Sequence, residues 1–341
     1  MTDPEPMIPI PPNLSALVYP WAWGADGPLK NFFAPPNEGY IVPGGSSGEL
    51  GWHSISTALI CPRKAWYKMQ YGAEFLEDES RESPDWKILG TAVHAGLAQH
   101  YECLRHYHEI GYNIYFNPVT ASPGYAVLKS VYEEVFVPQG FLSAEAWESK
   151  ARIAMTILEA YLRYWEAETR NLMAPASGYF VRSVEKTLHV KRPRLPARTQ
   201  RVDVEIQTPY GVIFGDHKIT QKAANRAIHV FSTDGQFDGY HEIGKATYGN
   251  GFFTSEVNVL HYTVLPTGKV RVGFARSHVP YRAQWDETIT RGLKIIADIR
   301  KRIREKRNGP AGISSYPVCH DWHDPCPFVT VCRANGLEVS I

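Results

Sequence analysis

Apolar and polar residues alternate along residues 202–206, and this period of two predicts a half-buried strand. A Thr-Pro-Tyr-Gly sequence at 208–211 follows and predicts a turn, because proline pre-sets the backbone φ angle at its second position. Residues 212–214 are continuously apolar and predict a second, more buried strand. The three segments together predict a hairpin.

Two carboxylates and a lysine gather at one end of this predicted hairpin. Antiparallel pairing would bring Asp203 to a position neighbouring Asp216, and Lys218 lies two residues beyond Asp216 on the same face. Such carboxylates can hold Mg²⁺ or Mn²⁺, while the lysine orients a water molecule or a phosphate. The alternative is an ordinary charged hairpin, because a lone D-x-K triplet often occurs by chance.

The same kinds of pattern predict elements along the rest of the chain. Helices are predicted at 86–110, about 144–171 and about 282–306, and strands at 179–190, 256–265 and 269–277. The polar segment 221–234 is predicted to be a loop or a short helix.

Four more polar residues on these elements are candidates for the same site. His94 follows Gly90 by four residues on a helix, so the two share a face and the glycine leaves room. Glu185 lies in a predicted strand, either as an outer carboxylate of the site or as a solvent-facing residue. Gln236 and Tyr240 share a face at i and i+4 if their segment is helical.

Charge and apolar content exclude some classes of protein. The net charge of the 341 residues is +1, so any contact with nucleic acid needs a local basic surface. Lys191, Arg192, Arg194 and Arg300 are the candidates for that surface. No run of 18 apolar residues exists, so we expect no membrane-spanning helix, and the acidic, proline-rich N-terminus does not resemble a signal peptide.

Cysteine spacing indicates a second centre. Cys319, Cys326 and Cys332 form a cluster near the C-terminus, and Cys61 would be a fourth thiolate. Because the chain shows no export signal, this cluster favours metal ligation over disulfides. Cys61 could instead be a small buried residue at a helix junction. Cys103 has no cysteine nearby and is predicted to be a free core thiol.

The order of these motifs resembles the RecB-like branch of the PD-(D/E)XK nuclease superfamily. More narrowly, it is similar to the iron–sulfur members, such as AddB nuclease domains and CRISPR-associated RecB-like exonucleases. The matching segments are Cys61-Pro62-Arg63, Gly90-Thr91-Ala92-Val93-His94, Asp203, Asp216-His217-Lys218, Gln236 to Tyr240, and Cys319, Cys326 and Cys332. Each motif is weak by itself, but their joint order from residue 61 to residue 332 is specific.

The resemblance implies a role for each matching residue. The catalytic metal, Mg²⁺ or Mn²⁺, would be bound by His94, Asp203 and Asp216. Lys218 would position or activate the attacking water, and Gln236 and Tyr240 would contact DNA or brace the site. The four cysteines other than Cys103 would hold a 4Fe–4S cluster. The gap between Cys319 and Cys326 is wider than the family's usual spacing, so Zn²⁺, with His320 or His323 as a ligand, stays an alternative.

The implied fold is an α/β restriction-endonuclease-like core with an N-terminal helical region and a cysteine-stapled C-terminus. Residues 1–50 would form a proline-rich irregular arm, and residues 51–341 the nuclease domain. Within that domain we expect a helical region at 51–175, a catalytic sheet core at 176–280, and a basic helix with a cysteine loop at 281–341.

The implied function is metal-dependent cleavage of DNA, most simply as an exonuclease on single-stranded ends during recombination, repair or phage DNA processing. The chain has no Walker motif, so a separate helicase or recombination protein is an expected partner. We expect a cytoplasmic location, in a bacterium or an infected host cell, and no membrane. The alternatives are an endonuclease or nickase of the same fold and a catalytically silent DNA-binding module.

Overall fold

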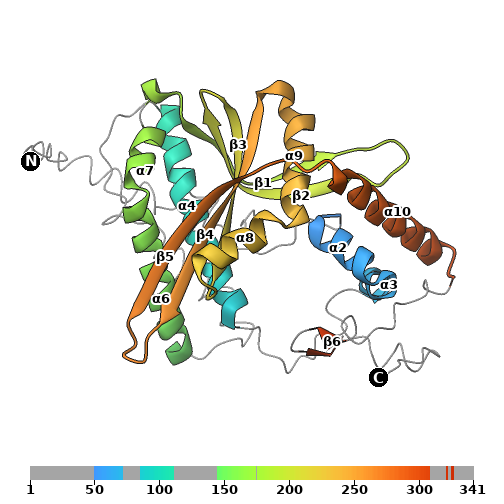
Figure 1. Cartoon of the computed structure of the whole chain (residues 1–341), viewed down its shortest axis with the longest axis horizontal. Helices are drawn as coiled ribbons and strands as arrows, with labels where there is room; N and C mark the ends of the chain where they lie inside the picture. Colours follow the sequence, from blue (N-terminus) through green and yellow to red (C-terminus); the bar gives the residue numbers. More distant parts are fainter. Residues whose placement is uncertain are drawn as a thin grey trace, which may run out of the picture.

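A single five-stranded sheet organises the protein (Figure 1). The computed structural model describes residues 50–71, 85–110, 144–173, 175–307, 320–321 and 324–325. The strands lie in chain order: β1 (Phe180–Val190), β2 (Arg198–Thr208), β3 (Gly211–Thr220), β4 (Phe252–Val264) and β5 (Val270–Val279). β3 and β4 run parallel, and each of the other neighbouring pairs is antiparallel. The predicted strands and the turn between β2 and β3 are confirmed.

Helices cover both faces of this sheet (Figure 1). One face packs against α4 (Asp85–Ile110), α6 (Ala144–Tyr164) and α7 (Glu166–Met173), and the other against α8 (Ala224–Ser232) and α9 (Gly235–Tyr248). Buried apolar side chains fill both interfaces, for example Leu97 with Leu158 on the α4 side and Phe214 with Phe237 on the α9 side. This layering is the mixed α/β architecture that the sequence predicted.

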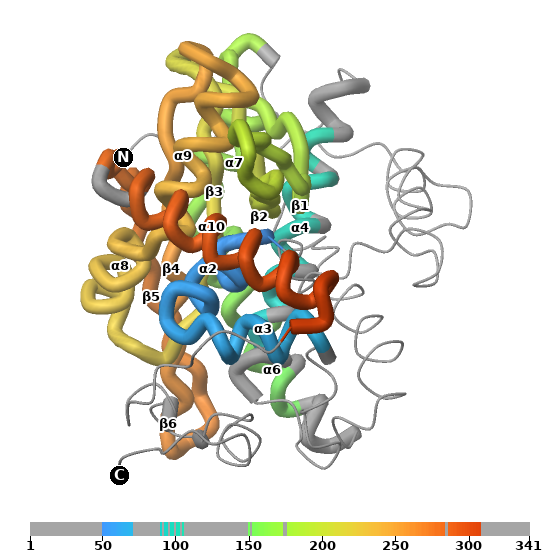
Figure 2. Tube along the Cα trace, turned by 90° about the vertical axis from the view of Figure 1, so that its right-hand side faces the viewer, coloured from blue at the N-terminus to red at the C-terminus, as the bar shows by residue number. Residues whose placement is uncertain are grey.

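A third apolar core joins segments that are far apart in the chain. α2 (Trp52–Ile60) and α3 (Pro62–Tyr71) pack beside α10 (Gln284–Arg304), as Figure 2 shows. Ile55 and Leu293 are among its fully buried residues. The helices approach closely at Gly292, where an added Cβ would lie 2.6 Å from Ile55 Cγ2. This core attaches the start of the described chain to its last long helix.

Short elements complete the described chain. One-turn 3-10 helices occupy η5 (Pro175–Ser177) and η6 (Gly249–Gly251), and two-residue strands β6 (His320–Asp321) and β7 (Asp324–Pro325) pair with each other. In the described ranges, no helix has both the length and the apolar character that crossing a bilayer needs.

One sequence prediction changes in detail, and the structure decides another between its two alternatives. The single helix predicted over about 144–171 is two helices, because α6 ends at Tyr164 and α7 begins at Glu166. The Trp165 ring at this break lies 3.6 Å from the Arg276 guanidinium, a cation–π contact that comes from the sheet. The segment 221–234, predicted as a loop or short helix, contains α8. The N-terminal arm lies outside the described residues, apart from Leu50.

Candidate metal centre

The candidate site lies where β2 and β3 separate. Their ladder ends at the pair Val204 and Gly215, and beyond it β2 continues to pair with β1 while β3 continues to pair with β4. Asp203 and Asp216 are the first residues past that last pair. The backbone N–H of His217 donates to Asp203 Oδ2 at 2.8 Å. The Asp203 carboxylate thus replaces the carbonyl of a paired strand as the acceptor for this N–H group.

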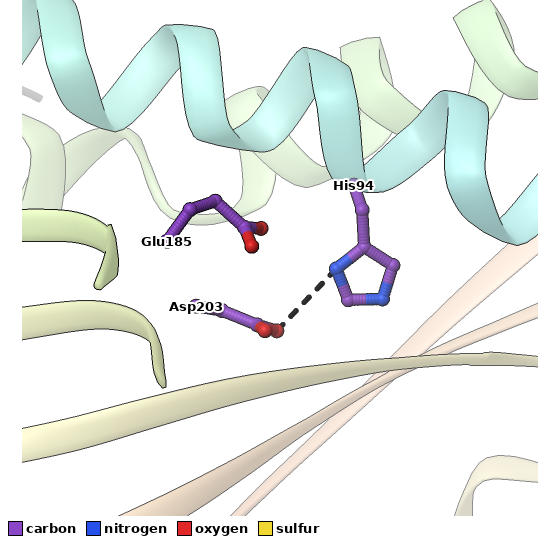
Figure 3. Close-up of side chains that lie close together, drawn as sticks. All are labelled: His94, Glu185 and Asp203. Atoms are coloured by element: carbon purple, nitrogen blue, oxygen red, sulfur yellow. Dashed lines mark ion pairs between the residues drawn. The ribbon is translucent and has the colours of Figure 1, made fainter. Parts of the chain in front are cut away.

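Three side chains converge at this point, as Figure 3 shows. His94 comes from α4, Glu185 from β1 and Asp203 from β2, and one ligand atom of each lies within 4.8 Å of the others. His94 Nδ1 is 3.4 Å from Asp203 Oδ2. Glu185 Oε2 is also 2.9 Å from Arg201 Nε, an ion pair that holds this buried carboxyl in place.

An irregular pleat brings the carboxylates of Glu185 and Asp203 to the side of the sheet that α4 covers. In a regular strand, successive side chains alternate between faces. Val202 packs in the core beneath α9, whereas Val204 packs in the core beneath α4. The predicted regular alternation through this strand is therefore wrong at Asp203, which faces α4 together with Val204.

Glu185 lies opposite this irregularity and has a φ of 50°, an uncommon backbone conformation for a residue other than glycine. Its neighbour Val184 also packs against α4, so here too two successive residues face one side of the sheet. Such a conformation costs on the order of 1–3 kcal/mol and is typically kept at functional sites. The strain is located at a residue of the three-residue cluster.

Charge and burial shift the pKa values of the three clustered side chains in different directions. Burial and the nearby Asp203 raise the pKa of Glu185 to about 8, although Arg201 opposes the shift. Burial alone would raise the pKa of Asp203, but the neighbouring side chains of His94 and His217 reverse this and hold that pKa below its ordinary value. Burial lowers the pKa of His94, which favours the neutral imidazole that a metal requires.

These donors fit a hard divalent cation. Two carboxylates with one imidazole match the preference of Mg²⁺ and Mn²⁺ for oxygen ligands with limited nitrogen. A cation at this point would also favour the ionised form of both crowded carboxyls. The residues present therefore suit the metal that the sequence analysis expected.

A second connected group lies beside this cluster, on the α9 side of β3. Asp216 Oδ1 accepts from Tyr240 OH at 2.7 Å and from Gln236 Nε2 at 2.9 Å. Lys218 Nζ lies 2.8 Å from Asp216 Oδ2 and donates to Gln236 Oε1 at 3.0 Å. Burial and Asp203 raise the pKa of Asp216 against the opposing effect of Lys218. The predicted i and i+4 pair on a helix is therefore present on α9.

Residues 51–333 match the family profile described as the PD-(D/E)XK nuclease superfamily. The chain belongs to this superfamily. Its members are nucleases that act on DNA and use divalent metals such as Mg²⁺. Among curated proteins, no sequence matches the chain.

Two solved structures share a distant likeness with this superfamily member. One is a protein from Eubacterium rectale, provisionally named an exonuclease, with 12% identity over 85% of this chain and 93% of its own, and a TM-score of 0.36. The other is SSO0001, with 12% identity over 68% of this chain and 94% of its own, and a TM-score of 0.26.

The structure brings together only part of the predicted set of metal ligands. His94 and Asp203 lie together as predicted, whereas the three-residue cluster contains Glu185 in place of Asp216. The side chain of Glu185 is buried, with 6% of the residue exposed, so the solvent-facing alternative is wrong. Asp216 adjoins the cluster through its neighbour His217 and pairs with Lys218.

Buried ion pairs hold α9, the helix that carries Gln236 and Tyr240. Asp238 pairs with Arg282 at 2.6 Å near the start of the helix. Further along, Glu242 pairs with the fully buried Arg198 at 2.9 Å and with Arg192 at 2.5 Å. Sequence patterns did not indicate these anchors, because each joins residues from separate elements.

Arg192 has a different environment from the one predicted. It was expected on a DNA-facing basic surface, but its guanidinium bonds to Glu242, Asp286 and Thr290. It therefore ties the hairpin between β1 and β2 to α9 and α10. Lys191 and Arg194 are exposed, as a nucleic-acid contact requires.

The predicted cysteine centre is described only at Cys61. This residue is a buried free thiol at the start of α3, and the Lys64 backbone N–H donates to its Sγ at 3.4 Å. Cys319, Cys326 and Cys332 lie outside the described residues, and so does the side chain of Cys103. The 4Fe–4S cluster, with Zn²⁺ as its alternative, stays a prediction.

Proposed function

We propose that this protein is a metal-dependent deoxyribonuclease that hydrolyses phosphodiester bonds. The observation that carries the proposal is the convergence of His94, Glu185 and Asp203 beside the ion pair of Asp216 and Lys218. The match to the PD-(D/E)XK nuclease superfamily supports it independently. A silent DNA-binding module would not need this convergent set of metal ligands beside a lysine.

Each side chain has a task that its contacts support. A bound Mg²⁺ or Mn²⁺ would neutralise negative charge that develops on the phosphate during hydrolysis. Lys218 would direct its ammonium at the attacking water or the phosphate, with Asp216 and Gln236 fixing its position. Tyr240 would hold Asp216 through its hydroxyl. These contacts pre-organise the charges before substrate arrives.

Among the described residues, part of the site is open to solvent. The side chains of His94 and Lys218 keep 25% and 24% of their surface exposed. One turn before His94, a Cβ added to Gly90 would meet no atom within 4 Å among the described residues. We infer that a phosphodiester approaches the metal ligands from the side of Gly90.

We infer that the preferred substrate is a single-stranded DNA end. The chain has no Walker motif with which to unwind a duplex, so a helicase or a recombination protein would deliver the strand. The resemblance to RecB-like iron–sulfur exonucleases supports the same substrate. Work of this kind belongs to bacterial or phage recombination and repair in the cytoplasm. Residues 51–341 would act as one nuclease domain, stapled by the four cysteines.

Cleavage of labelled DNA by the purified protein, with and without divalent metal, tests the proposal. Purified protein should degrade linear single-stranded DNA with Mg²⁺ or Mn²⁺ and stop when EDTA is added. Circular single-stranded DNA should survive if the enzyme needs an end. Cleavage of the circle would identify an endonuclease or nickase, and binding without any cleavage would identify a silent DNA-binding module.

A further inference from the structure

We propose that His217, the middle residue of the D-x-K motif, is a positioning residue for the metal centre, held in place by the buried pair Tyr101 and Tyr161. The inference rests on the proposed function. It concerns the imidazole side chain, because the bond from the His217 backbone N–H to Asp203 would survive any substitution but proline.

The His217 ring lies on the opposite side of β3 from its neighbours in the motif. Asp216 and Lys218 contact Gln236 of α9, so strand alternation directs His217 toward α4 and α6. The residue is 1% exposed. Its Nε2 is 3.0 Å from Tyr161 OH, which is 2.8 Å from Tyr101 OH. One hydrogen-bond chain therefore ties together β3, α6 and α4.

The other edge of the ring faces the metal cluster. His217 Nδ1 is 3.6 Å from Asp203 Oδ2 and has no hydrogen-bond partner in the part of the chain that the structure describes. The same Asp203 oxygen is 3.4 Å from His94 Nδ1. The two imidazole rings stand nearly perpendicular, with centroids 6.5 Å apart. Asp203 Oδ2 is thus enclosed between two histidines.

Packing alone would not require a histidine here. Ile219, two residues further along the same face, packs against the apolar core of α4 and α6. An aliphatic residue at position 217 could fill its space without burying polar atoms, which is costly unless they are bonded. The polar chain instead fixes the ring angle, and the ring limits the rotation of the Asp203 carboxylate. Partners that orient metal ligands in this way typically contribute 10–100-fold to affinity or activity.

The test is Mn²⁺ binding, followed by the electron paramagnetic resonance of the free ion, together with steady-state cleavage of single-stranded DNA. Tyr161→Phe removes the hydroxyl that holds His217 and keeps the ring. Tyr262→Phe is the matched control, because Tyr262 is also buried and its hydroxyl accepts one bond from Gln221, outside the cluster.

Tyr161→Phe should weaken Mn²⁺ binding by about tenfold or more and lower kcat, with the KM for DNA unchanged. Tyr262→Phe should lose some thermal stability and keep wild-type Mn²⁺ binding. His217→Gln, whose amide can replace Nε2 toward Tyr161, should retain more stability than His217→Leu but bind Mn²⁺ weakly.

Two outcomes would overturn the inference. Wild-type Mn²⁺ affinity in Tyr161→Phe and in His217→Leu would show that the chain only supports packing. Equal losses of Mn²⁺ affinity in Tyr161→Phe and Tyr262→Phe would show a general effect of stability. If wild-type protein itself bound no Mn²⁺ and cleaved no DNA, the proposed function would fail as well, so the two failures are distinguishable.

Discussion

Asp203 and Asp216 are the first residues past the last ladder pair of β2 and β3, yet their carboxylates have different partners. Asp203 faces His94 and accepts from the His217 N–H, whereas Asp216 pairs with Lys218 and accepts from Tyr240. The separation of the two strands thus creates two adjoining groups, one suited to a cation and one suited to positioning a lysine.

Replacing Asp216 should abolish cleavage without unfolding the protein. Asp216→Asn keeps an acceptor for Tyr240 but removes the charge that holds Lys218, so no product should form from labelled DNA. Glu256→Gln is the control, because Glu256 is also buried but pairs with Arg276 and not with Lys218. It should remain active at a similar melting temperature. Full activity of Asp216→Asn would remove this residue from the mechanism.

Lys218→Met should separate catalysis from metal binding. The substitution keeps the aliphatic stem and removes the ammonium, so kcat should fall by about 10²–10³-fold, as with other lost electrostatic contacts to a transition state. Mn²⁺ affinity should not fall, because Lys218 is not among the three clustered ligands. A variant with wild-type kcat would contradict the role proposed for this lysine.

Glu185 and Glu205 form a matched pair for testing the metal ligands. Both are buried glutamates on adjacent strands, but Glu205 bonds to Ser183, Lys186 and Tyr248 on the α9 side. Glu185→Gln should weaken Mn²⁺ binding by at least about tenfold. Glu205→Gln should cost stability and leave Mn²⁺ binding intact. Calorimetric titration would check both, and equal affinities would exclude Glu185 as a ligand.

Acid should destabilise the fold through His100. Burial lowers the pKa of His100 to about 3, from an ordinary 6.5, and the residue is 3% exposed. The unfolded chain therefore binds a proton that the folded chain does not. Above pH 6.5 His100 is neutral in both states and does not affect the free energy of unfolding. As pH falls from 6.5 toward 3, that free energy decreases by up to about 1.4 kcal/mol per pH unit.

Urea unfolding at several pH values would measure that slope. His100→Gln should flatten it, because glutamine does not titrate. His229→Gln, at an exposed position on α8, should leave the slope unchanged. An unchanged slope in His100→Gln would assign the acid sensitivity to other groups.

The cysteine centre should be visible in the purified protein. Anaerobic preparations should be brown if Cys61, Cys319, Cys326 and Cys332 hold a 4Fe–4S cluster, since Cys₄ ligation is typical of such centres. Cys61→Ser should lose the colour and destabilise the protein, whereas Cys103→Ser should keep the colour and the wild-type stability. Colourless protein with one equivalent of zinc would favour the alternative metal.

The sequence by itself determined the strands of the sheet, most of the long helices and the family. The strand that contains residues 202–206, the turn at 208–211 and the helix at 86–110 follow from local patterns, and the structure confirms these elements. The order of His94, Asp203 and the D-x-K residues is enough to indicate the nuclease superfamily. Local patterns suffice for these features because periodicity depends only on neighbouring residues.

Only the tertiary structure decided which side chains meet. The irregular pleat that turns Glu185 and Asp203 toward α4 breaks the periodicity on which sequence reasoning relies. Arg192 was predicted to face DNA, but its guanidinium forms ion pairs with Glu242 and Asp286, which lie far away in the chain. His217 on β3 is hydrogen-bonded to Tyr161 on α6, 56 residues away in the chain. Contacts of this kind depend on packing between distant segments, so no local pattern encodes them.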